Sequence, residues 1–245
     1  MNRSKKTAYQ QVWSPKPGQV VGTITTRQSL LQIPHLAKEQ EQPDYLELRL
    51  DCLLDINRDL LHETLQQCSI PLLLTVRHEA EGGYISDPHT RTELYTEFLS
   101  YATLIDIELQ FAAQFPALIA QIKEQNSGLI LSAHNFQEPF PLEEISQGYQ
   151  KAKAAGADIY KVAMMGGTEI EFAKLLQFTQ STNQDFSVMY MGAWGRLSRL
   201  LLALAGSTLN YGYTDIPNAD GQWKATDLKK AIREFQSQSS KPLFL

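Results

Sequence analysis

The sequence predicts an α/β protein with a (β/α)8 barrel fold, also called a TIM barrel, in a single domain. Three observations predict it: short β-branched apolar runs alternate with amphipathic stretches, there are eight such runs, and the chain has 245 residues. Strands that alternate with helices are typical of parallel βα units. Eight such units usually occupy roughly 250 residues. A doubly wound open sheet is the alternative fold that the same alternation permits.

The apolar runs give the expected strands in chain order. They lie at residues 20–26, 45–50, 72–77, 104–109, 129–134, 159–165, 186–191 and 209–214. Amphipathic stretches with a 3.6-residue period predict helices between them, for example at residues 90–101, 112–124, 142–155 and 169–179. Thr168 and Glu171 form a capping-box pattern at the start of the last of these helices. Residues 1–18 are polar and are expected to form a tail, which leaves residues 19–245 for the barrel.

Composition and charge exclude several classes of function. Lys and Arg total 22 against 27 Asp and Glu, a net charge of −5, which argues against nucleic acid or an anionic membrane as the main partner. No apolar run approaches the roughly 20 residues that a membrane span needs, and the N-terminus lacks the apolar stretch of a secretory signal. Cys52 and Cys68 have no metal-site spacing and are too few for a disulfide scaffold. We expect a soluble, cytoplasmic protein with reduced thiols and no metal.

We single out ionisable residues in four of the predicted strands, because barrel strands should be apolar on both faces. Glu47 and Arg49 share one face of the second run, Arg77 ends the third, and His134 ends the fifth. An edge strand with one solvated face would explain one such case. Active sites of barrels form at the carboxyl ends of the strands, so we expect these side chains to converge at one rim.

Lys161 is the fourth case and the most informative one. Ile159, Val162, Ala163 and two methionines surround it in the sequence. Burial among such residues penalises the ammonium and favours the neutral amine. A neutral amine can attack a ketone and form a Schiff base. The structural alternative is a lysine that forms a salt bridge with Glu47 or Glu108 inside the barrel.

Two of the five histidines are candidates for proton transfer. His134 lies in Ser-Ala-His-Asn-Phe at a predicted strand end, and His78 directly follows Arg77. An imidazole titrates near neutrality and can take up and return a proton within one turnover, which favours His134 at the rim. A purely structural hydrogen bond is the alternative role. Glu81, in Glu-Gly-Gly, offers a carboxylate nearby or belongs to a plain turn.

Two loops near the C-terminus complete the candidate site. The loop after the seventh run matches neither the dinucleotide fingerprint nor the P-loop, so we assign it no nucleotide. Arg199, which follows that loop, can clamp a carboxylate with its planar fork. The Pro- and Gly-containing loop at residues 216–222 is a candidate lid.

In combination, these motifs resemble those of the type I 3-dehydroquinate dehydratases. The motifs are Glu47-x-Arg49-x-Asp51, Thr75-x-Arg77 with Glu81-Gly82-Gly83, Ser132-x-His134-x-Phe136, Lys161-Val162-Ala163, Leu197-Ser198-Arg199 and Gly221-Gln222. Each motif is short, but all six keep their order from about residue 20 to residue 222. The resemblance therefore covers nearly the whole chain.

The resemblance implies a cofactor-free barrel, usually a homodimer, that converts 3-dehydroquinate to 3-dehydroshikimate in the shikimate pathway. It makes Lys161 the Schiff-base lysine and His134 the general acid and base, with Glu81 beside the histidine to tune it. The remaining positions imply substrate contacts: Glu47, Arg49 and Arg77 to the ring hydroxyls, Arg199 to the carboxylate, Met189, Met191 and Tyr211 as an apolar wall, and Asn218 and Gln222 from the lid.

The lid departs from the family pattern. Family members usually carry Ser-Ala-Pro-Gly-Gln, where this chain has Asn-Ala-Asp-Gly-Gln at residues 218–222. An inward Asp220 would repel a bound carboxylate, so we expect it to face water. Two alternatives to the dehydratase stay open from the residues: another aldolase-type Schiff-base barrel, and a non-catalytic barrel that binds a metabolite.

Overall fold

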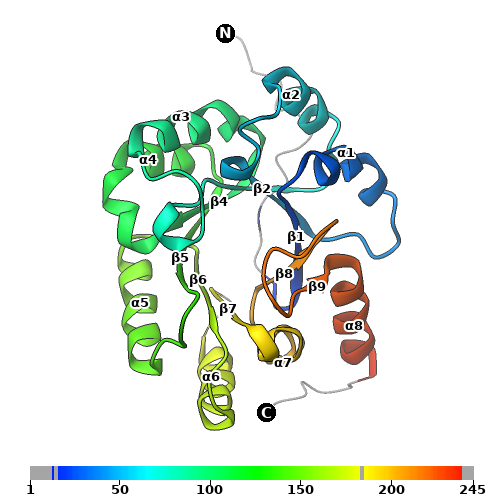
Figure 1. The fold of residues 1–245 in the computed structure, drawn as a ribbon. Helices are drawn as coiled ribbons and strands as arrows, with labels where there is room; N and C mark the ends of the chain where they lie inside the picture. The colour runs from blue at the N-terminus through cyan, green and yellow to red at the C-terminus, as the bar shows by residue number, and fades with distance from the viewer. Residues whose placement is uncertain (1–12, 14–15, 183–184, 239–245) are drawn as a thin grey trace.

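The computed structural model describes residue 13 and residues 16–182 and 185–238. Within this part of the chain, nine strands form one sheet in which every pairing is parallel. The strands are β1 (Gln19–Ile24), β2 (Tyr45–Arg49), β3 (Leu72–Thr75), β4 (Ala102–Glu108), β5 (Gly128–Asn135), β6 (Ile159–Met165), β7 (Phe186–Met191), β8 (Leu209–Tyr213) and β9 (Trp223–Lys224). Their order is β7-β6-β5-β4-β3-β2-β1-β8-β9, and Figure 1 shows them curled into a ring with the helices outside.

Side-chain hydroxyls join the ring where β7 meets β8. The Ser187 hydroxyl accepts a hydrogen bond from the Leu209 N–H at 2.9 Å, and the Ser207 hydroxyl accepts one from the Val188 N–H at 3.1 Å. The Thr208 N–H adds a backbone bond to the Phe186 carbonyl at 3.0 Å. The predicted (β/α)8 barrel is confirmed, with a seam that is bridged largely by serine.

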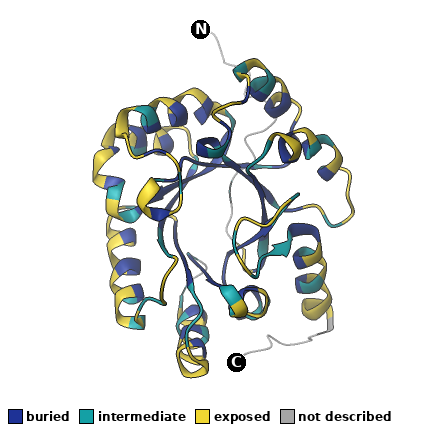
Figure 2. Cartoon of the chain, viewed as in Figure 1, coloured by how far each residue is buried: buried dark blue, intermediate teal, exposed yellow. Residues whose placement is uncertain are grey.

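Eight α-helices surround the sheet in the described part of the chain. They are α1 (Arg27–Leu36), α2 (Arg58–Gln66), α3 (Pro88–Phe98), α4 (Pro116–Glu124), α5 (Leu142–Ala154), α6 (Glu169–Ser181), α7 (Gly195–Ala205) and α8 (Ala225–Gln238). Short 3-10 helices occur at η1 (Leu50–Cys52), η2 (Glu79–Glu81), η3 (Leu99–Tyr101), η4 (Leu109–Gln114) and η5 (Gly192–Trp194). The helices bury the face that meets the sheet and expose the other, as Figure 2 shows.

Each of the eight predicted strands is present, and two of them, β6 and β7, match to the residue. The third is shorter than expected because the Arg77 N–H bonds to the Asp51 carboxylate at 3.1 Å instead of to a neighbouring strand. The helix expected at 112–124 begins only at Pro116, which has no N–H to give and suits a first helical turn. The capping box of Thr168 and Glu171 is confirmed. The two-residue strand β9 was not predicted.

Inside the barrel, the period of two along each strand stacks the side chains in levels. The level at the amino ends of the strands is apolar and consists of Val21, Tyr45, Leu73, Leu104, Ile130, Ile159 and Leu209, with Trp13 packed against it. Two residues further along six of these strands, the inward position is polar and buried: Thr23, Glu47, Thr75, Asp106, Ser132 and Lys161. The fold thus places a polar level directly above an apolar floor.

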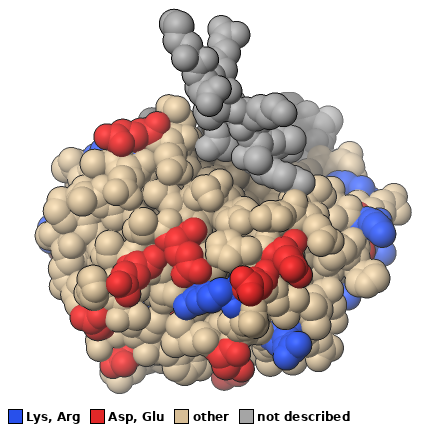
Figure 3. Space-filling model, turned by 90° about the horizontal axis from the view of Figure 1, so that it is seen from above, with Lys and Arg blue, Asp and Glu red and all other residues tan. Residues whose placement is uncertain are grey.

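The predicted tail, residues 1–18, falls almost wholly outside the described residues. In the described part, no helix combines the length and the apolar character that crossing a bilayer requires. The face shown in Figure 3 carries acidic side chains interspersed with basic ones, and its described residues form no continuous basic area.

Candidate active site

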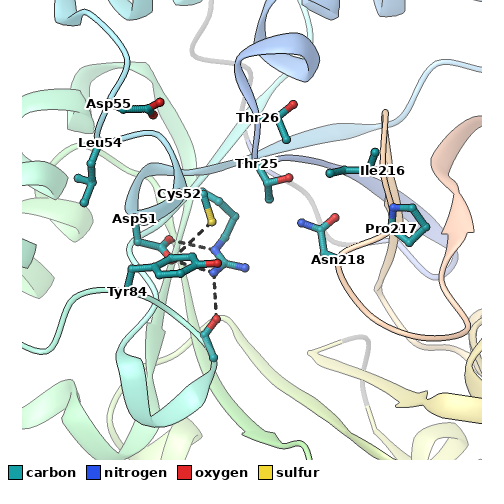
Figure 4. Close-up of a pocket in the computed structure, with 12 residues that line it drawn as sticks. Thr25, Thr26, Asp51, Cys52, Leu54, Asp55, Tyr84, Ile216, Pro217 and Asn218 are labelled. Carbon is teal, nitrogen blue, oxygen red and sulfur yellow. Dashed lines mark hydrogen bonds and ion pairs between the residues drawn. The ribbon is translucent and has the colours of Figure 1, made fainter.

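A cavity of about 520 Å³ opens at the carboxyl ends of the strands. Thr25, Thr26 and Asn218 line one side of it, and Asp51 and Tyr84 line another, as Figure 4 shows. Arg49 also lines the cavity. Its size falls within the range of small-molecule sites. Lys161, His134 and Arg199 are not among the residues that line it; they lie in or beside the barrel interior that it overlies.

Lys161 forms an ion pair inside the barrel. Its Nζ lies 2.8 Å from Oδ2 of Asp106, and the side chain is only 3% exposed. The Nζ also lies 4.3 Å from the centre of the Tyr211 ring. The amine of Lys161 therefore does not lie in the apolar surroundings that the sequence led us to expect. It forms a salt bridge, which was the structural alternative. The acidic partner is Asp106, rather than Glu47 or Glu108.

Asp106 is the centre of a buried polar network. The Arg77 guanidinium lies 3.1 Å from its Oδ2, and the Ser132 hydroxyl donates to its Oδ1 at 2.6 Å. Burial alone would raise the pKa of Asp106, but Arg77 and Lys161 outweigh it and hold that pKa far below its usual range. Asp106 therefore stays ionised beside the amine.

His134 and Glu81 form a second buried pair. Nδ1 of His134 lies 2.7 Å from Oε2 of Glu81. Burial, together with the charges of Arg77 and Lys161, lowers the pKa of His134 well below its ordinary value. Burial also raises the pKa of Glu81 to about 7. The first shift keeps the imidazole neutral and able to accept a proton, and the second means that Glu81 ionises only near neutral pH.

Glu81 reaches the histidine because the chain turns tightly after β3. The His78 imidazole accepts a hydrogen bond from the Ala80 N–H at 3.0 Å and caps η2, which ends at Glu81. Gly82 follows with φ = +80°, a conformation that a residue with a Cβ rarely adopts. The predicted Glu-Gly-Gly loop is thus an ordered turn that presents a carboxylate. His78 itself stacks on Phe111 at 3.9 Å and is occupied with this turn.

Arg199 differs from the other buried arginines of the site. Its guanidinium is 2% exposed and donates to the backbone carbonyls of Tyr211, Tyr190, Gly195 and Gly221. No carboxylate among the described residues forms an ion pair with it. Burial without an acidic partner lowers its pKa to about 10, so it remains a cation at neutral pH. An anionic ligand would supply the missing counter-charge.

Arg77 and Arg49 each have acidic partners. Arg77 contacts Asp106 and also Glu108, at 3.2 Å. Burial alone would lower the pKa of Arg77, but these carboxylates hold it well above its ordinary value. Arg49 makes a two-point contact with Asp51 at 3.0 and 2.8 Å. Asp51 thereby fixes Arg49 at the wall of the mouth cavity.

The remaining predicted side chains on the strands are buried, and one of them, Tyr211, lies beside the amine of Lys161. Met189 and Met191 are buried on β7, and Glu47 accepts a hydrogen bond from the Thr75 hydroxyl at 2.8 Å. Tyr211 supplies the ring beside Lys161, but its buried hydroxyl has no hydrogen-bond partner in the described part of the chain. The wall expected to be apolar therefore carries one unsatisfied polar atom.

The predicted lid packs against the start of α7. Asn218 accepts a hydrogen bond from the Thr23 hydroxyl at 2.9 Å, and its N–H donates to the Gln222 side chain at 2.8 Å. A Cβ at Gly195 would lie 2.7 Å from the Gly221 carbonyl, so only glycine permits this close approach. Asp220 is exposed, as expected.

Asp106 and Arg91 were not predicted from the sequence, and Ser132 was noted there only as part of a motif. Asp106 carried the same signal as Lys161, an ionisable residue inside an apolar strand, and could have been found by it. Arg91 on α3 is fully buried and pairs with Glu108. Its position on an amphipathic helix gives no such signal.

Comparison with known proteins places the chain in a family. Residues 20–239 match the family model for type I 3-dehydroquinase. The 3-dehydroquinate dehydratase of Geobacillus sp. (strain WCH70) is 33% identical over 212 residues, which cover 80% of this chain and 82% of that relative. The corresponding enzyme of Methanothrix thermoacetophila is 31% identical over 197 residues, 80% of this chain and 83% of that relative.

Solved structures agree with the sequence comparison. The crystal structure of 3-dehydroquinate dehydratase from Geobacillus kaustophilus HTA426 is similar with a TM-score of 0.78 and 25% identity, over 92% of this chain and 93% of that one. The Clostridium difficile enzyme has a TM-score of 0.80 at 24% identity, over 92% and 95% of the two chains, a likeness of fold. The chain belongs to the type I 3-dehydroquinase family.

Proposed function

We propose that this protein dehydrates 3-dehydroquinate to 3-dehydroshikimate through a Schiff base on Lys161. The observation that carries the proposal is the arrangement of three features in one barrel. They are a buried lysine on β6 that faces a carboxylate, a neutral histidine on the neighbouring β5 that Glu81 holds, and a buried arginine with no acidic partner among the described residues. The family membership supports the same reaction.

The first step forms the imine. The Lys161 nitrogen adds to the C3 ketone and passes protons of its ammonium to the ketone oxygen, which leaves as water, so that the imine keeps the positive charge. The iminium nitrogen then occupies the place of the ammonium beside Asp106, 2.8 Å away in the free protein. A fixed carboxylate at this distance stabilises the positive charge of the iminium. The iminium withdraws electrons and makes the neighbouring C2 hydrogen more acidic.

The second step transfers protons. Nε2 of His134 takes the C2 proton, and the electron pair moves into the imine to give an enamine. The enamine expels the C1 hydroxyl, which leaves as water with the proton that His134 returns. Hydrolysis by one water releases the product and restores Lys161, so that one water is lost overall.

The other predicted residues bind and orient the substrate in this proposal. Arg199 pairs with the substrate carboxylate, and Gln222 and Asn218 reach it or the ring from the lid. Arg49 and Glu47 bind the ring hydroxyls, while Met189, Met191 and Tyr211 form the wall. Fixing the carboxylate decides which face of the ring meets His134.

Arg77 takes a different role from the one implied by the resemblance. Its contacts with Asp106 and Glu108 leave it largely engaged within the protein. We assign it to holding Asp106 ionised and oriented, with any contact to a ring hydroxyl secondary.

The setting of the enzyme belongs to the proposal as well. We propose that residues 19–245 act as one catalytic domain, in a cytoplasmic homodimer that uses neither a cofactor nor a metal. The proposed reaction needs no cofactor, because every step moves only protons and water. Nucleic acid and membrane are not partners in this proposal, in keeping with the net charge of −5.

A direct assay tests the proposed function. Purified protein is mixed with 3-dehydroquinate, and the absorbance of the conjugated enone product is followed. The matched variant is Lys161→Arg, which keeps a cation beside Asp106 but cannot form the imine. We expect turnover in the wild type and a loss of at least about 10³-fold in the variant with its fold preserved. Absence of turnover in the wild type would overturn the proposal.

A further inference from the structure

The carboxylate that holds His134 has a second partner. Oε2 of Glu81 contacts Nδ1 of His134 at 2.7 Å, and Oε1 accepts a hydrogen bond from the side-chain amide of Gln110 at 2.6 Å. Glu81 is 4% exposed, so these two bonds account for both of its oxygens. Gln110, Glu81 and His134 therefore form one chain of hydrogen bonds.

Gln110 reaches Glu81 from a different element. It lies in η4, directly after the strand that carries Asp106. It lines a second cavity of about 450 Å³, between η4 and α5, together with Glu81, His134 and Gln147. Without the amide, Oε1 of Glu81 would face this cavity rather than a protein donor.

Because Gln110 donates its hydrogen bond to Glu81, it favours the ionised form of that carboxylate. A side-chain N–H can donate but not accept, and it bonds most strongly to an ionised carboxylate. An ionised Glu81 accepts the proton of Nδ1 and leaves the lone pair on Nε2. A protonated Glu81 could instead donate to Nδ1, which would move the imidazole hydrogen to Nε2 and remove the base.

We propose that Gln110 is a positioning residue that keeps Glu81 ionised and thereby keeps Nε2 of His134 ready to accept a proton. The proposal rests on the role of His134 as the base in the proposed function. It goes beyond that function because the resemblance assigns nothing to Gln110.

The electrostatics of Glu81 agree with this role. Burial raises the pKa of Glu81 to about 7, and the hydrogen bond from Gln110 acts in the opposite direction. Loss of the bond should raise that pKa further. Since the active pair has an ionised Glu81, activity falls as the pH drops through this pKa, and the acidic limb should move to higher pH without Gln110.

The test compares Gln110→Leu with Gln147→Leu. Both glutamines line the same cavity, but Gln147 donates to Glu143 on its own helix and does not contact Glu81. We expect the acidic limb of kcat to move up by about one pH unit in Gln110→Leu, so that kcat well below the limb falls about tenfold. KM should change less than about twofold, and Gln147→Leu should match the wild type. Gln110→Met, which also lacks the amide, repeats the test if the leucine variant folds poorly.

A second readout separates this proposal from the proposed function. Nitrogen-15 NMR of the imidazole reports which ring nitrogen of His134 carries the hydrogen, with no need for turnover. We expect Nδ1–H in the wild type at pH 8 and a gain of Nε2–H in Gln110→Leu. Unchanged nitrogen shifts together with an unchanged acidic limb would overturn the role of Gln110. A wild type that does not turn over 3-dehydroquinate would instead overturn the proposed function, and the NMR result would still decide the role of Gln110.

Discussion

At the scale of single residues, the buried arginines of the site differ in whether an acidic side chain pairs with them. Arg77 and Arg49 are neutralised by carboxylates of the protein, whereas Arg199 bonds only to backbone carbonyls among the described residues. Keeping a buried guanidinium without a counter-charge costs stability in the free protein. We propose that binding of an anion recovers this cost and that Arg199 pairs with the substrate carboxylate.

His134 should be essential, and His78 should not. His134→Ala removes the proton carrier but leaves Lys161 and Asp106 in place, so we expect turnover to fall by about 10³-fold or more while the imine still accumulates. His78 stacks on Phe111 and caps η2, so the matched variant His78→Ala should cost less than about tenfold. Rapid mixing with mass spectrometry measures the imine. A nearly silent His134→Ala would show that another group moves the proton.

Tyr211→Phe should change stability and affinity in opposite directions. The buried Tyr211 hydroxyl has no hydrogen-bond partner among the described residues, and removing it relieves a desolvation penalty, so we expect the free energy of unfolding to rise by about 1 kcal/mol. The Tyr211 ring lies beside Lys161, so we expect its hydroxyl to contact the substrate there, and KM should rise by about threefold or more when that contact is lost. Denaturant unfolding and steady-state kinetics measure the two effects. A destabilised variant with unchanged KM would contradict this account.

At the scale of elements, the alternation of side chains along the strands accounts for the features that could be predicted from the sequence. Alternation along a strand places Lys161 two residues beyond Ile159, and Asp106 two residues beyond Leu104, on the same inward face. The eight strands and the rim location of His134 could therefore be predicted from the sequence. The contact between Lys161 and Asp106 could not, because the pairing across the barrel depends on the stagger of strands far apart in sequence. Arg91 could not be predicted either, because a charged residue on an amphipathic helix gives no signal that it is buried.

The lid makes a prediction for two of its side chains. Gln222 is half-buried and bonds to the Asn218 N–H, whereas Asp220 is exposed to solvent. We expect Gln222→Ala to raise KM about tenfold, which corresponds to roughly 1.4 kcal/mol. Asp220→Asn should change KM less than about threefold, because solvent screens a charge that points away from the site. Steady-state kinetics on both variants measure this. A large gain in affinity from Asp220→Asn would show that the charge turns toward the ligand.

At the scale of the whole molecule, the barrel works as a stack of levels. An apolar floor with Trp13 closes the amino end, a polar level holds Lys161 and Asp106, and the mouth cavity lies at the carboxyl end. The serine-bridged seam between β7 and β8 and the extra strand β9 could not be predicted, since both depend on how the ring closes rather than on a local pattern. The levels inside the barrel follow from the alternation of side chains along each strand. The closure of the ring between β7 and β8 follows from tertiary packing.

The central claim is that Lys161 forms a covalent imine with the substrate, and one measurement tests it most directly. The protein is treated with borohydride in the presence of 3-dehydroquinate, digested, and mapped by peptide mass spectrometry. The account predicts a reduced adduct on Lys161 alone, with irreversible loss of activity, and no adduct when substrate is left out. An adduct on a different lysine, or none in a sample that turns over substrate, would contradict it.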